Sequence, residues 1–286
     1  MIRRYPPIPL GSAVVVVTGG AQGVGRATAA QLHELGAIVW IGDSDIDAAE
    51  AVAHDLGPGT FAFPLDVKSR DSWHAFRDHV VALHDHIDIL VNNAEIISAG
   101  PFLDEGDDLS RAVIDTNLVG LILGMRTVLP AMVADGRGHV VNVASLAGKA
   151  PIPGLSVYNA SQYAAVGLTA SVREEMRPAG VSVSAVLPCA VTASPPSASS
   201  LFRGLPTATP DEVAEAIIRN CFTRKPEVAV PRYTAMWDLV NAVVPGPILR
   251  TALRLLGNDR LLTSGAGVNR SRHLMPTGAG PHADFK

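Results

Sequence analysis

The sequence predicts an α/β fold built on a doubly wound parallel sheet with helices on both faces, a three-layer α/β/α arrangement. Short apolar, β-branched runs alternate with helical stretches, and a polar or glycine-rich turn follows each run. This alternation is typical of parallel sheets. No internal repeat or long linker divides the 286 residues. We expect one domain over residues 1–264, including a helical C-terminal extension at about 231–264, and a disordered tail at 265–286.

The first strand is expected at 13–18, where four valines in a row are typical of a central parallel strand. Further strands are expected at 37–42, 60–65, 87–92, 139–144, 181–187 and 227–230, and helices at 25–36, 47–56, 69–86, 108–134, 158–177 and 210–221. Ligands of such sheets bind at the carboxyl ends of the strands, where the strand order switches. The polar or turn residues at those ends are Thr18, Asp43, Asp66, Asn92, Ser145 and Pro188.

Two segments lie outside this alternation. Residues 189–209 are rich in Ser, Pro and Ala, which predicts a loop that is either a lid over the site or a plain connection. Residues 235–262 alternate apolar and basic residues. They would cover a substrate pocket, join an oligomer or lie on a membrane surface, and the short apolar runs favour the last reading least.

Composition excludes several function classes. The formal net charge is −4 and no Lys/Arg run exceeds two residues, which argues against nucleic-acid binding. The longest apolar stretch, 112–134, contains Asp115, Asn117 and Arg126, so it predicts a core or interface helix rather than a membrane span. Two cysteines cannot form a disulfide framework, and the N-terminus has no apolar core of signal-peptide type. We therefore expect a cytoplasmic protein.

The turn after the first strand, residues 18–25, holds four glycines and opens a helix. Such a turn lets a dinucleotide pyrophosphate sit on the helix N-terminus. Asp43 follows at the end of the second strand, eighteen residues past Gly25, where its carboxylate would accept hydrogen bonds from a ribose and repel a 2′-phosphate. Neither Gln22 nor Ser44 is basic, so NAD is favoured over NADP. The residues assigned to this contact are Gly19, Gln22, Gly23, Val24, Gly25 and Asp43.

Two hydroxyls and an amide are expected to meet at the end of the fifth strand. Ser145 closes that strand, and Tyr158 opens the next helix after a loop that contains prolines and glycines. Gln162 lies one helical turn after Tyr158, on the same face. Removing hydride from an alcohol requires its proton to leave as well, which a tyrosine accepts only if its pKa falls toward the working pH.

These motifs in this order resemble the short-chain dehydrogenase/reductase family over residues 11 to 230. The resemblance rests on the glycine spacing at 18–25, on Asn92-Asn93-Ala94, Asn117 and Ser145, and on Tyr158 thirteen residues later. It implies a Rossmann-type fold, a nicotinamide cofactor, hydride transfer between a hydrophobic alcohol and a carbonyl, and a homodimer or homotetramer. In the resemblance, Ser145 binds the substrate oxygen, Tyr158 is the acid/base and Asn117 holds a water relay. Cofactor contacts come from Asp66, Val67, Asn93, Ala94, Tyr158 and the backbone of Val191.

The chain departs from the family around the nicotinamide half. Gln162 stands where the family has the lysine that lowers the pKa of the tyrosine, and Glu95 and Cys189 stand where it has glycines. Lys149 is an alternative source of the missing charge. The sequence thus leaves two readings: an NAD(P)-dependent dehydrogenase/reductase with Gln162 in its catalytic set, or a silent dinucleotide-binding homologue with a regulatory or scaffolding role. The spacing of the histidines predicts no metal site, which disfavours a zinc-dependent dehydrogenase.

Overall fold

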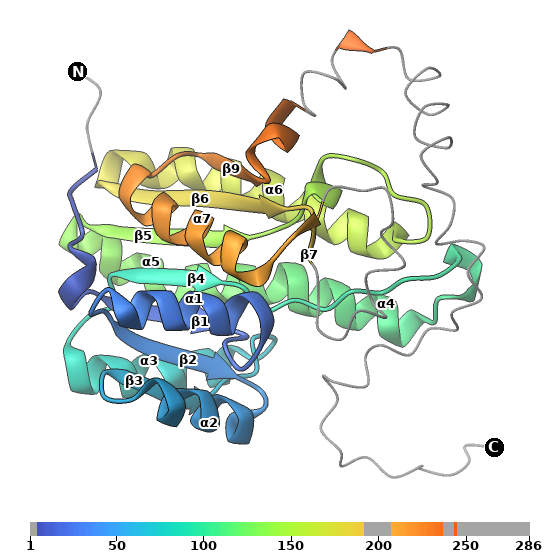
Figure 1. Ribbon diagram of the computed structural model, residues 1–286. Helices are drawn as coiled ribbons and strands as arrows, with labels where there is room; N and C mark the ends of the chain where they lie inside the picture. The colour runs from blue at the N-terminus through green and yellow to red at the C-terminus, as the bar shows by residue number, and fades with distance from the viewer. Residues whose placement is uncertain (1–4, 192–206, 237–242, 245–286) are drawn as a thin grey trace.

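The computed structural model describes residues 5–191, 207–236 and 243–244, and it is built on a seven-stranded parallel sheet (Figure 1). The strand order is β3-β2-β1-β4-β5-β6-β9, so the order switches between β1 and β4. The strands are β1 (Val14–Thr18), β2 (Ile38–Asp43), β3 (Thr60–Pro64), β4 (Ile89–Asn92), β5 (Gly138–Val143), β6 (Val181–Pro188) and β9 (Glu227–Val230). The predicted doubly wound fold is confirmed.

Helices cover both faces of the sheet. On one face lie α1 (Gly23–Glu34), α2 (Ile46–Leu56) and α7 (Pro210–Thr223), and on the other lie α3 (Arg70–His84), α5 (Leu121–Asp135) and α6 (Ser156–Met176) (Figure 1). Short 3-10 helices are η1 (Leu10–Ser12), η2 (Phe102–Asp104), η4 (Leu146–Gly148), η5 (Arg177–Ala179) and η7 (Arg232–Met236).

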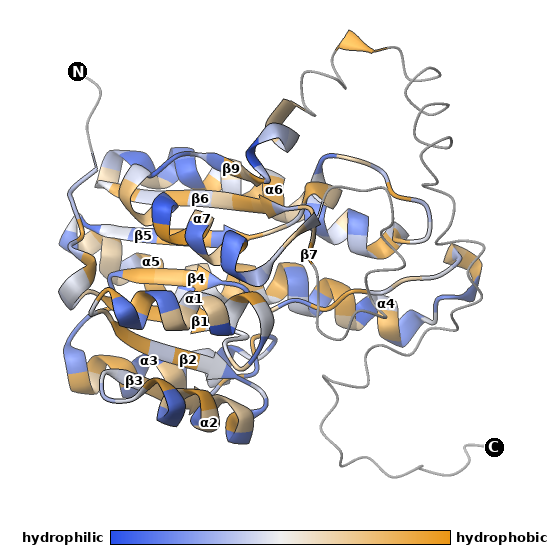
Figure 2. Cartoon of the chain, viewed as in Figure 1, coloured by the Kyte–Doolittle hydropathy of each residue, from blue (hydrophilic) through white to orange (hydrophobic). Residues whose placement is uncertain are grey.

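The core has two halves, one on each face of the sheet. Successive residues of β1 point to opposite faces, so Val15 and Val17 join the cluster under α1 and α7, while Val14 and Val16 join the cluster that contains Trp73. Burial on both faces explains why the strands are continuously apolar rather than alternating. Figure 2 shows this apolar character along β4 and β6.

The helix predicted at 108–134 is continuous over Asp107–Asp135 but changes its winding in the middle. It consists of α4 (Asp107–Ile114), the π-helical segment η3 (Asp115–Gly120) and α5. Its length and mean hydropathy of 1.6 would suffice to cross a membrane, but 56% of the apolar window is buried inside the protein. It therefore serves as a core helix here. π-helical turns are frequent at functional sites, and this one carries Asn117.

The remaining differences concern element ends. The fourth strand begins at Ile89 rather than at residue 87, although the backbone of Asp88 still bonds to Val14 and His139. The Asp88 carboxylate accepts the Val14 N–H at 3.1 Å and pairs with Arg137 at 2.6 Å. The ends of the predicted 189–209 loop form a small parallel ladder, β7 (Ala190–Val191) with β8 (Thr207–Ala208). Residues 192–206, most of the expected 231–264 extension and the 265–286 tail lie outside the described residues.

Candidate active site

The glycine-rich turn, residues 18–25, joins β1 to α1 at the point where the strand order switches. Gly19 has a positive φ of 65°, and a Cβ there would lie 2.9 Å from the Cα of Ala94. A Cβ on Gly25 would overlap the carbonyl oxygen of Gly19. These glycines allow the turn to lie against the end of β4, which no side chain would permit.

Space for an anion lies over the N-terminus of α1. A Cβ added to Gly23 would meet no atom within 4 Å, and the N-cap residue Gln22 makes no side-chain capping hydrogen bond. The first N–H groups of a helix lack intrahelical partners and favour negative charge. The arrangement around Gly23, Val24 and Gly25 fits a pyrophosphate.

Side chains at the ends of β1 and β4 fix this turn. Thr18 Oγ1 accepts the N–H groups of Asn93 at 2.9 Å and of Ala94 at 3.0 Å. Asn93 Nδ2 donates to the carbonyl oxygens of Thr18 at 3.0 Å and Gly19 at 3.2 Å. The structure thus brings Asn93 and Ala94 to the turn, and their contact with the adenosine side of the cofactor stays a prediction. The sequence placed Thr18 at the end of the first strand but did not assign it a contact in the site.

Asp43 holds the turn from the side of β2. Its Oδ2 accepts the Ala21 N–H at 3.0 Å, its Oδ1 accepts the Asp45 N–H at 3.1 Å, and the residue is 8% exposed. A carboxylate offers about four acceptor positions. Two N–H groups therefore leave capacity for ribose hydroxyls, and Asp43 has both a structural role and the geometry for the predicted contact.

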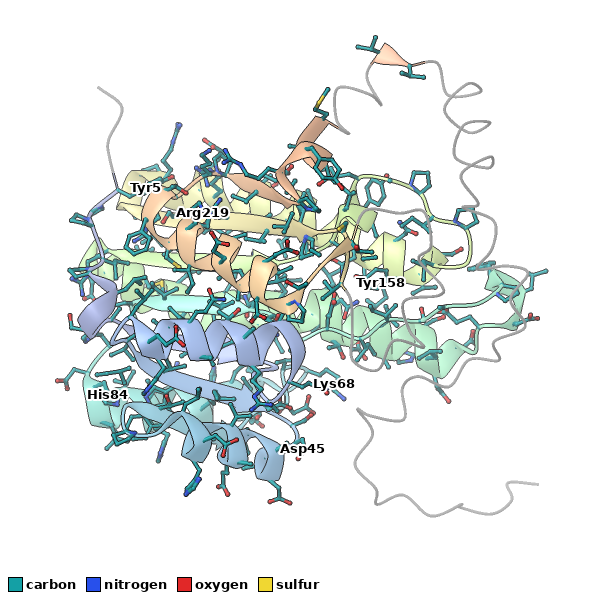
Figure 3. The ribbon with its side chains drawn as sticks, viewed as in Figure 1. Tyr5, Asp45, Lys68, His84, Tyr158 and Arg219 are labelled. Atoms are coloured by element: carbon teal, nitrogen blue, oxygen red, sulfur yellow. The ribbon has the colours of Figure 1, made fainter. Side chains whose placement is uncertain are left out.

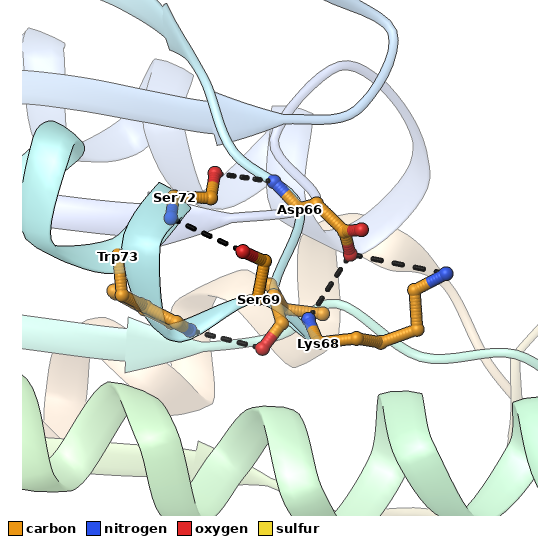
Figure 4. Close-up of polar contacts among 6 residues, drawn as sticks. Asp66, Lys68, Ser69, Ser72 and Trp73 are labelled. Atoms are coloured by element: carbon orange, nitrogen blue, oxygen red, sulfur yellow. Dashed lines mark hydrogen bonds and ion pairs between the residues drawn. The ribbon is translucent and has the colours of Figure 1, made fainter.

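The loop after β3 is rigidly built (Figure 4). Asp66 donates its N–H to Ser72 Oγ at 3.0 Å, and its half-exposed carboxylate accepts the Lys68 N–H at 3.0 Å. The carbonyl of Val67 accepts Trp73 Nε1–H at 3.0 Å, which ties the loop to a buried indole. This loop presents Asp66 and Val67 at the carboxyl edge of the sheet, where an adenine contact is predicted.

Ser145 and Tyr158 meet at the end of β5, as the sequence predicts. Ser145 Oγ accepts the Ala147 N–H at 3.1 Å and donates to the Pro188 carbonyl oxygen at 3.4 Å. The hydroxyl also lies near enough to the phenol of Tyr158, in the first turn of α6, to lower the pKa of that phenol. The loop between them is tied by Asn159, whose Nδ2 donates to the carbonyls of Ala147 at 2.6 Å and Ala150 at 2.7 Å. Figure 3 shows Tyr158 beside the carboxyl ends of the strands.

The side chain of Glu95 contacts Tyr158 and Gln162, the two predicted site residues on α6. Its Oε2 accepts Tyr158 Oη–H at 3.2 Å and Gln162 Nε2–H at 3.3 Å. Tyr158 and Gln162 are 5% and 2% exposed. Gln162 Oε1 is buried and makes no hydrogen bond within the described part of the chain. One turn of α6 thus presents a phenol and an amide to one carboxyl group, an arrangement that the sequence did not reveal.

Burial of Glu95 and Tyr158 favours the protonated form of both side chains. Burial raises the pKa of Glu95 to about 7, although its hydrogen bond with Tyr158 lowers it in part. Burial and then the charge of Glu95 raise the pKa of Tyr158 well above its ordinary value, and the hydrogen bond from Ser145 opposes this only in part. Near neutral pH the tyrosine is therefore an acid, held in its neutral form.

Asn117 connects the π-helical segment to the strand-four loop and to α6. It forms paired hydrogen bonds of 2.9 Å with the N–H and C=O of Ile96, and its Nδ2 donates to Ser161 Oγ at 3.1 Å. A small cavity lies between Asn117, Glu95 and Gln162, with about 10 Å³ of room for the centre of a water molecule. That volume is near the minimum for one ordered water.

Other predicted groups lie further from the tyrosine. Lys149 Nζ forms an ion pair with Glu227 on β9 at 3.0 Å, and the charge acting on Tyr158 is that of Glu95. Lys149 therefore does not replace the missing ammonium. Val191 lies in β7. Among the residues that the structure describes, no group of three or more His, Cys, Asp or Glu side chains is arranged to hold a metal.

A family model described as short chain dehydrogenase matches residues 13–200. The chain belongs to this family. The match spans the turn at 18–25, Glu95, Tyr158 and Gln162.

Individual relatives agree with this membership. A Mycobacterium tuberculosis protein named Probable oxidoreductase EphD is 32% identical over 266 residues, which cover 85% of this chain and 45% of that protein. The chain thus spans about half the length of this curated relative. A metagenomic short-chain oxidoreductase solved with NADP superposes with a TM-score of 0.66 and 33% identity over 76% of this chain and 96% of that one. A Brucella melitensis 3-ketoacyl-(acyl-carrier-protein) reductase solved with NADH has a TM-score of 0.71 and 26% identity over the same shares.

Proposed function

We propose that this protein is a nicotinamide-dinucleotide-dependent oxidoreductase that interconverts a hydrophobic secondary alcohol and its ketone. The observation that carries this proposal is the meeting of Ser145 and Tyr158 at the end of β5, on the sheet edge that also holds the glycine-rich turn. Membership of the short-chain family and neighbours that bind NADP and NADH support it.

The turn at 18–25 and the α1 N-terminus would hold the pyrophosphate, and Asp43 the adenosine ribose. The loops that carry Asp66 and Ala94 would flank the adenine and adenosine. The bound dinucleotide supplies or accepts the hydride. Ser145 positions the substrate oxygen, and Tyr158 gives or takes the proton at that oxygen through its Oη. Gln162, whose buried Oε1 has no partner within the described residues, would hydrogen-bond the nicotinamide ribose.

We propose that NAD is preferred over NADP. The Asp43 carboxylate lies at the end of β2, only 8% exposed, where it would accept ribose hydroxyls and repel a 2′-phosphate. In the sequence its neighbours Gln22 and Ser44 bring no positive charge to this position. One structural neighbour is solved with NADP and another with NADH, so the proposed preference rests on Asp43 itself.

We also propose a homodimer or homotetramer. The resemblance to the short-chain family implies such an assembly, and the exposed Val133 (40%) on α5 and Tyr163 (45%) on α6 put apolar surface on the two helices expected to form the interface. A monomeric mass by light scattering would contradict this.

The test of the proposed function is cofactor binding followed by turnover. Calorimetric titration of the full chain with NADH and NADPH should show tighter binding of NADH, and a panel of hydrophobic ketones should then be reduced with loss of NADH absorbance. Asp43→Asn should weaken NADH binding by about tenfold or more, through loss of a charge-assisted hydrogen bond, and should narrow the preference over NADPH. Absence of binding of either dinucleotide would overturn the proposal. Binding without any turnover would favour the silent homologue instead.

A further inference from the structure

The carboxyl group of Glu95 lies where a proton can pass to and from the Tyr158 phenol. Glu95 Oε2 and Tyr158 Oη are 3.2 Å apart, and Gln162 Nε2 donates to the same carboxyl oxygen at 3.3 Å. This distance is within the range for direct proton transfer between a side-chain acid and its partner. An amide at 162 orients the carboxyl group but, unlike an ammonium, brings no charge that would force it to ionise.

The surroundings of Glu95 keep this contact isolated. The walls of the small cavity beside it are otherwise uncharged: β1 presents Thr18, the π-helical segment presents Asn117, β5 presents Val143 and α6 presents Gln162. Tyr158 is the titratable group that acts on Glu95, and Lys149 pairs with Glu227. The charge balance of the tyrosine is therefore controlled by one neighbour.

We propose that Glu95 is the proton partner of Tyr158 and replaces, by a neutral carboxylic acid, the positive charge that is absent at position 162. This inference rests on the proposed oxidoreductase function. In the reducing direction a reduced nicotinamide dinucleotide supplies hydride to the carbonyl carbon, and Tyr158 Oη gives its proton to the carbonyl oxygen. The O–H bond of Glu95 then breaks and its proton moves to the phenolate oxygen of Tyr158. A water in the cavity beside Asn117 gives a proton to the carboxylate and takes one from bulk solvent, so that one solvent proton is consumed for each ketone reduced.

The electrostatics of the pair make this order of events favourable. Burial holds the pKa of Glu95 at about 7, so a large part of it carries a proton near neutral pH. A phenolate beside an ionised carboxylate would place two negative charges within about 3 Å, which is strongly unfavourable in a buried site. A protonated Glu95 removes that conflict, because one negative charge is then shared by the pair. Reduction should consequently be fastest while Glu95 is neutral and should slow as pH rises through about 7.

The experiment compares wild type with Glu95→Gln, an isosteric change that retains a hydrogen-bond acceptor for Tyr158 but cannot exchange a proton. NADH-dependent ketone reduction is followed against pH, with NADH affinity measured in parallel by fluorescence. We expect Glu95→Gln to lower the rate by about 100-fold or more, to leave NADH affinity within a small factor, and to abolish the decline centred near pH 7. Glu105→Gln, on the exposed loop before α4, is the matched control and should behave as wild type.

A second readout does not depend on turnover. The ultraviolet phenolate titration of the cofactor-free protein, with Tyr158→Phe as the blank, should show a lower pKa for Tyr158 in Glu95→Gln than in wild type, since the neighbouring negative charge is gone. Glu95→Asp keeps the charge but withdraws the carboxyl group by one methylene, and it should also lose most of the rate.

The outcomes separate this inference from the proposed function. If wild type binds no NADH, the proposed function fails and the inference fails with it. If wild type binds and reduces ketones while Glu95→Gln keeps the wild-type rate and pH midpoint, the inference alone is overturned. A rise in rate in Glu95→Gln also overturns it, because Glu95 would then be an obstacle to the nicotinamide rather than a proton partner.

Discussion

The two halves of the site are built in different ways. In the half around the glycine-rich turn, each of these contacts has the main chain on at least one side: Gly19 lies against Ala94, and the side chains of Thr18 and Asp43 each accept two backbone N–H groups. The half around Tyr158 depends on side chains, with one Glu95 oxygen between a phenol and an amide. Backbone contacts tolerate few changes of residue. Side-chain contacts allow the chemistry to be rearranged while the fold is kept, and Glu95 and Gln162, the residues expected from the sequence to depart from the family, lie in this second half.

The largest expected effect comes from removing the phenol. Tyr158→Phe should lower the rate of ketone reduction by about 10²–10⁴-fold, the usual contribution of a positioned acid or base, while NADH binding persists because the turn at 18–25 is untouched. Single-turnover kinetics and NADH fluorescence measure the two quantities separately. Simultaneous loss of rate and binding would show that the two halves are not independent.

Gly25→Ala alters the half of the site around the glycine-rich turn. The new Cβ would overlap the carbonyl oxygen of Gly19 and lie 2.7 Å from Asn93 Nδ2, so the turn must shift. We expect loss of NADH binding and about 1–3 kcal/mol of destabilisation in urea unfolding. The control is Gly167→Ala in α6, where a Cβ meets nothing within 4 Å. It should be neutral or stabilising by up to about 1 kcal/mol. Wild-type binding by Gly25→Ala would refute the close-packed turn.

Much of the fold and of the two halves of the site could be predicted from the sequence. The valines of β1 predict the sheet, because burial on both faces leaves few alternatives to a central strand. The glycines after β1 and the polar strand ends predict the nucleotide side, because close backbone approach leaves few alternatives to glycine. Ser145 and Tyr158 were expected to meet, and they do. Asn117 was correctly expected in the site. The π-helical winding of the segment that carries it was not expected.

The position of Glu95 could not be predicted in the same way. Its place after Asn92-Asn93-Ala94 indicated a charge near the cofactor, but its partners depend on a rotamer and on the turn of α6 at Ser156, two residues before the predicted helix start. The engagement of Lys149 by Glu227 is likewise a contact between elements far apart in the sequence. Periodicity and turn signals carry no information on such pairings.

Gln162→Lys tests the half of the site around Tyr158 by placing an ammonium beside the phenol. The charge should lower the pKa values of both Glu95 and Tyr158, by roughly 1–3 units for a close opposite charge. The decline of the reduction rate should therefore move to lower pH, which a pH–rate profile detects. Gln162→Met removes the amide without adding charge and is the control. A gain from near-zero activity in Gln162→Lys would support the silent-homologue reading, and an unmoved profile would place residue 162 outside the proton path.

The smallest expected effect is on stability. The pKa of Glu95 is raised from 4.5 to about 7 in the folded protein, so the folded state keeps a proton that the unfolded chain has lost between these values. The stability contributed by the neutral carboxyl is complete below the unfolded pKa and is lost as pH rises through about 7. Glu95→Gln cannot ionise and should exceed wild type by about 1–2 kcal/mol above neutral pH, after allowance for solvent screening of a part-buried group.

Urea unfolding of both proteins at acidic and at alkaline pH measures this difference. Equal stability at acidic pH and a gap at alkaline pH are expected. A gap that is independent of pH would show that the glutamine alters packing rather than charge.

The most direct measurement is a crystal structure of the protein with NAD⁺ at neutral pH. We expect the pyrophosphate over Gly23, the adenosine ribose at Asp43 and the nicotinamide ordered beside Tyr158, with Glu95 still in contact with the phenol. An ordered adenosine half with the nicotinamide excluded by Glu95 would contradict the proposed chemistry. Adenosine bound away from Asp43 would contradict the assignment of the site.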